Sequence, residues 1–163
     1  MSHCLAGAGL FGATALTYSA GATLYATMLT YTTSKIVPAV SGSVEGADPT
    51  ACVAVIDAVD WAAVMTAWMQ TQEAPLPAVV FQPEADRKAE FHVSTVPGPA
   101  SSFYLQVLFK RDEKIGWIRS RRQVVSAELH DPATLTRCLA DLDAGRFAEL
   151  AQRLNDEGRN VMN

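Results

Sequence analysis

The chain has 163 residues, of which 49% are hydrophobic and 18% are charged, and its net charge is −4. This length suits one domain, and the apolar content excludes an intrinsically disordered chain. The acidic balance provides no basic surplus of the kind that binds nucleic acid, so we expect no nucleic-acid partner.

The cysteines and histidines show no spacing that predicts a disulfide framework or a metal site. Cys4, Cys52 and Cys138 are far apart and form no C-x-x-C pair, and none of the histidines has a partner four residues away. No set of nucleophile, base and orienting carboxylate can be assembled from the sequence. We therefore expect no metal, no cofactor and no enzymatic activity.

The first 34 residues, Met1 to Ser34, contain no Lys, Arg, Asp or Glu. A bilayer is spanned by about 20 apolar residues, and Leu10, Leu16 and Leu24 belong to a pattern with the helical spacings of three and four. The segment has neither the charged start of a signal peptide nor the arginines of a matrix-targeting peptide. It predicts an uncleaved transmembrane helix that anchors the protein in the inner mitochondrial or a bacterial inner membrane.

Small residues occur throughout this segment. Gly7, Gly9, Gly12 and Gly21 would let another helix approach closely, so we predict that they form an interface with a partner helix. Three of them also match the G-x-G-x-x-G pattern of dinucleotide sites, but that site needs a preceding strand and an acidic residue about 20 positions later. The next carboxylate is Glu45, so helix packing is the preferred interpretation.

A β-hairpin is the alternative interpretation of the same segment. Ala15–Ser19 and Thr23–Tyr31 are rich in Thr and Tyr and flank the short connection Ala20–Ala22, as paired strands often do. The apolar residues do not alternate at period two, and the helix is therefore preferred.

A linker is predicted over residues 35–47, because Ser41–Gly46 is rich in Ser and Gly. It separates the anchor segment, residues 1–34, from a small α+β domain at residues 48–163.

The domain is predicted to begin with a second apolar helix over Thr50–Gln72. Asp48 and Pro49 supply an N-cap and a proline at the first helical position. Its packing face is predicted from four apolar residues spaced three and four apart: Trp61, Val64, Met65 and Trp68. Of these, Trp61 and Trp68 are candidate contacts for a partner protein.

Asp57 and Asp60 are the only charged residues of this predicted helix, and they share one of its faces. We expect both carboxylates to lie on its exposed side, since burial without a partner would be costly. If the helix instead crossed a membrane, the pair would mark a proton or ion path.

A small antiparallel sheet is predicted next. Three runs rich in β-formers are the expected strands: Ala78–Gln82, Glu90–Val96 and Ser102–Phe109. Arg111–Lys114 is predicted to be a connection, and a fourth strand is expected from Ile115–Ile118 with Gln123–Ser126.

Arg119, Arg121 and Arg122 lie close to Trp117 in the sequence. Guanidinium groups suit phosphate and carboxylate, so these arginines are candidates for binding lipid headgroups, nucleic acid or an acidic partner. A solvated sheet edge is the simpler interpretation.

Two amphipathic helices are predicted at the C-terminus. Asp131 and Pro132 repeat the cap and proline, and Gly145 ends the first of these helices. A second, short helix carries Phe147, Leu150 and Leu154 and ends near Gly158. Helices that follow a sheet predict the α+β class.

These features predict a non-catalytic accessory or scaffolding subunit of a larger membrane complex, with other subunits and the lipid bilayer as its partners. The alternative is a soluble structural or binding component of a virion-like assembly, whose N-terminus pairs as strands. A third hypothesis is an enzyme that uses Asp57 and Asp60.

Overall fold

The computed structural model describes residues 28–45, 48–72, 74–97, 103–115, 117 and 119–160. These residues form an α+β fold, as predicted, with four α-helices and a six-stranded antiparallel sheet. In chain order the elements are β1 (Met28–Ser34), β2 (Ser41–Glu45), α1 (Pro49–Asp57), α2 (Trp61–Thr71), β3 (Ala78–Pro83), the 3-10 turn η1 (Glu84–Asp86), β4 (Ala89–Pro97), β5 (Phe103–Ile115), β6 (Arg119–Leu129), α3 (Pro132–Asp143) and α4 (Phe147–Asn160).

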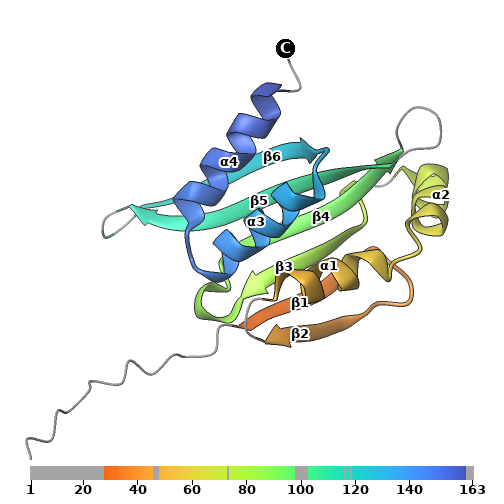
Figure 1. Cartoon of the computed structure of the whole chain (residues 1–163), viewed down its shortest axis with the longest axis horizontal. Coiled ribbons are helices and arrows are strands. Elements are labelled where there is room, and N and C mark those ends of the chain that lie inside the picture. Colours follow the sequence, from red (N-terminus) through yellow and green to blue (C-terminus); the bar gives the residue numbers. More distant parts are fainter. Residues whose placement is uncertain are drawn as a thin grey trace, which may run out of the picture.

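The strands lie in the order β2-β1-β3-β4-β5-β6, and each pairs antiparallel with its neighbours. Helices α1, α3 and α4 lie over one face of the sheet, and α2 lies at the end where β4 finishes (Figure 1). The core forms between that face and the helices. On the strands, Val79, Phe81, Phe91, Val93 and Phe109 are fully buried in it, and burial of each contributes about 2 kcal/mol.

The last part of the uncharged segment is strand β1, so the helix prediction is wrong for Met28 to Tyr31. Leu29 pairs with both Val44 and Pro83, and its side chain is fully buried. On one side the strand is stabilised by β3 partners that lie 44 to 54 residues away along the chain, which local spacing does not reveal. Residues 1–27, where any anchor helix would have to lie, are outside the described residues.

The linker prediction is wrong for Ser41–Glu45, because these residues form the edge strand β2. The serines and the glycine pair with β1, and Val44 faces the core. Gly42 is needed here, since a Cβ at this position would lie 2.7 Å from the Tyr31 hydroxyl. Close approach of an aromatic ring therefore explains a glycine that resembled a flexible connection.

The single helix predicted over Thr50–Gln72 is two helices, α1 and α2. Asp48 caps α1 as predicted, and its carboxylate accepts a hydrogen bond from the Thr50 N–H at 2.9 Å. Asp60 caps α2 by accepting from the Ala63 N–H at 3.1 Å. An aspartate that bonds the backbone three residues later starts a new helix, which accounts for the break.

The three strands predicted from runs of β-formers are present as β3, β4 and β5, although β5 continues past the predicted end at Phe109 to Ile115. Arg111–Lys114, however, is no connection but the last part of β5, and it pairs with Ser120–Gln123 of β6. Strand β4 accompanies β5 only as far as Arg111. Beyond it, Asp112–Ile115, Trp117 and Arg119–Arg122 form a two-stranded extension that we call the β5–β6 arm.

Both C-terminal helices are confirmed. The Asp131 carboxylate caps α3 by accepting from the Ala133 N–H at 2.9 Å, and Gly145 has the positive φ of 68° that favours glycine after a helix. Helix α4 runs to Asn160 and is longer than expected.

Among the described residues, no single helix is long and apolar enough to cross a membrane. Helices α1 and α2 are long and apolar enough for a membrane span only when they are taken together, and the pair is bent by 59° at the break.

Candidate functional site

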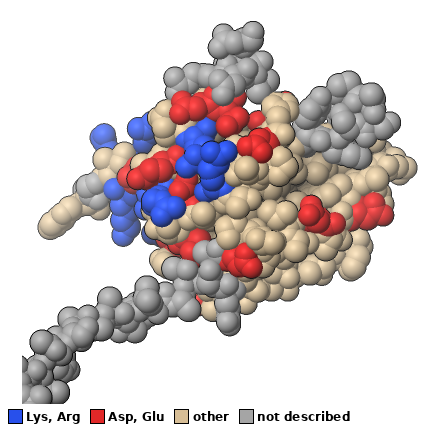
Figure 2. Space-filling view, viewed as in Figure 1, with Lys and Arg blue, Asp and Glu red and all other residues tan. Residues whose placement is uncertain are grey.

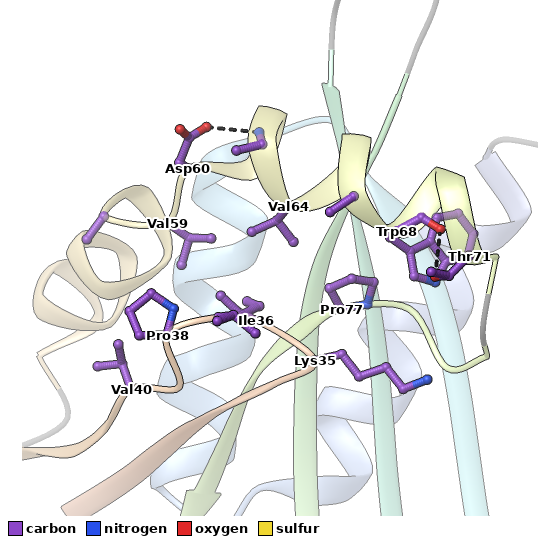
Figure 3. Close-up of a pocket in the computed structure, with 14 residues that line it drawn as sticks. Lys35, Ile36, Pro38, Val40, Val59, Asp60, Val64, Trp68, Thr71 and Pro77 are labelled. Carbon is purple, nitrogen blue, oxygen red and sulfur yellow. Dashed lines mark hydrogen bonds between the residues drawn. The ribbon is translucent and has the colours of Figure 1, made fainter.

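An apolar groove lies between the β1–β2 loop and helix α2, at one end of the sheet (Figure 3). Its volume is about 740 Å³, within the range of about 300 to 1,000 Å³ that ligand sites occupy. Ile36, Val59 and Val64 point toward one another across it. Trp68 and Pro77 line the end of the groove that is nearer Lys35.

The β1–β2 loop is held in place by backbone and side-chain hydrogen bonds. The Thr33 N–H donates to the Val40 carbonyl at 2.8 Å, and the Val40 N–H donates to the Thr33 hydroxyl at 2.7 Å. Lys35 has the left-handed φ of 57°, and its ammonium donates to the Ala74 carbonyl at 2.9 Å. These hydrogen bonds close the loop, and Val37 lies at its surface and is 91% exposed.

The two tryptophans proposed as partner contacts have different roles. The Trp61 indole N–H donates to the Ile56 carbonyl at 2.9 Å, so Trp61 ties α2 to the end of α1. Trp68 is partly buried and lines the groove. Met65 on the same helix face is fully buried, as the predicted packing face requires.

Asp57 and Asp60 are both exposed, as predicted. Figure 3 shows the Asp60 carboxylate at the rim of the groove, where it caps α2. Asp57 is the last residue of α1. The role of Asp60 in this geometry is therefore structural, as the cap of α2.

The predicted arginine site is divided by the fold. Arg122 is engaged by Asp112, whose two oxygens accept from its Nε and Nη2 at 2.9 and 3.2 Å. This pairing lowers the pKa of Asp112 and raises that of Arg122. Arg119 and Arg121 are exposed at the start of edge strand β6. Figure 2 shows Lys and Arg side chains gathered on the left of the molecule, where the arm projects in Figure 1, with carboxylates among them.

A polar cluster lies on the sheet face opposite the helices. His92 Nε2 is 2.8 Å from Glu90 Oε2, and the Lys110 ammonium is 3.9 Å from the same oxygen. Gln82 Nε2 donates to the other Glu90 oxygen at 3.4 Å. Burial lowers the pKa of His92, although its hydrogen bond with Glu90 acts in the opposite direction.

The described cysteines are buried free thiols. Burial raises the pKa of Cys52 to about 11 and that of Cys138 to about 12, so both stay protonated and unreactive at neutral pH. Among the residues that the structure describes, no three His, Cys, Asp or Glu side chains are grouped so that they could hold a metal ion.

The sequence did not predict the groove. Val37, which is exposed in its lining, lies in Lys35–Pro38, which resembled the end of an anchor followed by a linker. The available signal in the sequence was the apolar run Ile36–Val40 between Lys35 and Ser41. Gly7, Gly9, Gly12 and Gly21, the predicted helix-packing residues, lie outside the described residues.

Comparisons of the chain with models of protein families, with curated proteins and with solved structures found no match.

Proposed function

We propose that the protein is a non-catalytic accessory subunit of a larger membrane complex, held at the bilayer by its N-terminal segment. The observation that carries the proposal is the length of uncharged chain before the sheet. Residues 1–27 contain no Lys, Arg, Asp or Glu and precede the first residue of β1. About 20 apolar residues suffice for a membrane span.

The groove supports a protein-binding role for the folded part. Most of the side chains that line it are apolar, and Val37 and Val40 among them are exposed. Apolar side chains that cluster at a surface commonly mark a contact site. We propose that an apolar segment of a neighbouring subunit occupies the groove.

Extraction of membranes with alkaline carbonate tests the anchor, and native electrophoresis of the detergent extract tests the complex. We expect the protein to remain with the membranes and to migrate in a species much larger than its own 17.5 kDa. Val37→Asp should release it from that species without changing its thermal unfolding, because Val37 is almost fully exposed. Ala39→Asp, an exposed substitution in the same loop but not in the groove lining, is the matched control.

A soluble component of an assembly is the second candidate function. The observation that favours it is that Met28–Ser34, the end of the Thr-rich segment, pairs as a strand. Release of the protein into the carbonate supernatant would favour this candidate over the anchored subunit.

A further inference from the structure

The tip of the β5–β6 arm exposes large apolar side chains between cations. Trp117 is fully exposed and Ile115 is 51% exposed. In the antiparallel register Ile115 lies opposite Arg119, and Lys114 lies opposite Ser120. A tryptophan beside an aliphatic residue and flanked by Lys and Arg is the composition that favours the interface of a membrane.

The charges of the arm differ from those of the rest of the chain. Its four cations and two carboxylates give it a net charge of +2, in a chain whose net charge is −4, so the remainder carries −6. The Asp112 carboxylate is engaged by Arg122. Within the part of the chain that the structure describes, Lys114, Arg119 and Arg121 form no ion pair, and all three are exposed.

The arm and the N-terminal segment are brought to the same end of the sheet by topology. Strand β1 begins at one end, and the antiparallel order β1-β3-β4-β5 returns the end of β5 to it. In Figure 1 the start of β1 and the end of β5 both lie on the left. A membrane reached by residues preceding Met28 would therefore lie on the side toward which the arm projects.

We propose that the β5–β6 arm docks on the surface of an anionic lipid bilayer, with Trp117 and Ile115 at the interface and Lys114, Arg119 and Arg121 against the headgroups. The inference deepens the proposed function, because it supplies a second membrane contact beside the N-terminal segment. The positive arm faces the anionic surface, and the negative remainder is held away from it. A bilayer offers an apolar interior to Trp117 and Ile115 and anionic headgroups to the three cations. An acidic protein surface without an apolar patch would leave Trp117 and Ile115 in water.

Quenching of Trp117 by brominated lipid tests the proposal. The full chain is combined with vesicles of phosphatidylcholine, with and without phosphatidylglycerol, and the signal of Trp117 is taken as the difference between the parent and Trp117→Phe. We expect quenching that is strong on the anionic vesicles and weak on the neutral ones. Because Trp117 contacts water on all sides, its replacement leaves the fold intact.

A matched pair of arginine variants tests the headgroup contact. Arg119→Gln should lower the ratio of quenched to unquenched Trp117 about fivefold, the factor that one cation near an anionic leaflet typically contributes. Arg137→Gln, which removes an exposed cation from α3, should leave the ratio unchanged.

The outcomes separate this inference from the proposed function. Quenching of Trp117 on added anionic vesicles by a protein that carbonate releases would support the arm and reject the anchor. A protein that resists carbonate but whose Trp117 is not quenched would keep the anchor and overturn the arm. Equal quenching in the two arginine variants would also overturn the headgroup contact.

Discussion

Asp141 is a buried carboxylate on α3 that pairs with Arg146 and with Arg153 of α4. Its side chain is 6% exposed, and its two oxygens accept from Arg146 Nε at 2.9 Å and from Arg153 Nη2 at 2.8 Å. The carboxylate raises the pKa of Arg153. A buried carboxylate is tolerated here because two guanidinium groups compensate its charge.

Asp141→Asn should lower the free energy of unfolding by about 2 kcal/mol, because the amide carries no negative charge and presents an NH2 group, which cannot accept, to one of the two guanidinium groups. The loss stays below that of a fully buried pair, since Arg146 and Arg153 are 50% and 32% exposed and water can solvate them. Urea unfolding measures the difference. Asp57→Asn at an exposed position is the control and should change stability by less than about 0.5 kcal/mol; equal losses in the two variants would refute the role of Asp141.

His92 should make stability depend on pH. Burial lowers its pKa below the ordinary value of 6.5, so the unfolded chain takes up a proton in a range where the folded chain does not. Stability is therefore lost as pH falls below about 6.5. His92→Gln should reduce the loss of unfolding free energy between about pH 7 and pH 5. His130→Gln, at an exposed histidine, is the comparison, and an identical effect of the two substitutions would contradict the assignment to His92.

The break between α1 and α2 depends on Asp60. Its carboxylate accepts a hydrogen bond from the Ala63 N–H, and the Trp61 indole N–H donates to the Ile56 carbonyl. Asp60→Ala should cost about 1 kcal/mol of stability, whereas Asp60→Asn should cost little because asparagine also caps helices. Thermal unfolding of the two variants measures this. If both substitutions were equally destabilising, the negative charge rather than the cap would be responsible.

The elements that the sequence predicted correctly are those with local signals. Asp48 and Asp131 cap helices through the backbone next to them, and β3, β4 and β5 are rich in β-formers. Strand β1 was expected only in part, by the alternative hairpin interpretation, because its pairing with the distant strand β3 has no local signal. Strand β2 was missed because Gly42, which lies under the Tyr31 ring, resembled a linker glycine. Arg111–Lys114 was mistaken for a turn, because charged residues form strand there only through cross-strand partners such as Arg122 opposite Asp112.

The candidate surfaces were predicted in part. Trp68 and the exposed arginines follow from residue type and spacing, and the structure assigns Trp68 to the groove and Arg119 to the arm. The groove itself required tertiary contact, since it joins the β1–β2 loop to a helix about 30 residues later along the chain.

In the proposed arrangement the protein is a folded α+β body with a membrane on one side. The start of β1, which the uncharged residues 1–27 precede in the sequence, and the positive arm lie at one end of the sheet, and the groove lies at the other. Such a subunit would contact lipid and partner protein at opposite ends.

The most direct test of the anchor is carbonate extraction of Leu16→Lys beside the parent chain. A lysine in the middle of a membrane span opposes insertion by about 3 kcal/mol, so the variant should move to the supernatant while the parent stays with the membranes. Ala39→Lys adds the same charge at an exposed loop position outside the groove lining and should stay with the membranes. A parent chain that carbonate releases, or a Leu16→Lys variant retained like the parent, would contradict the account.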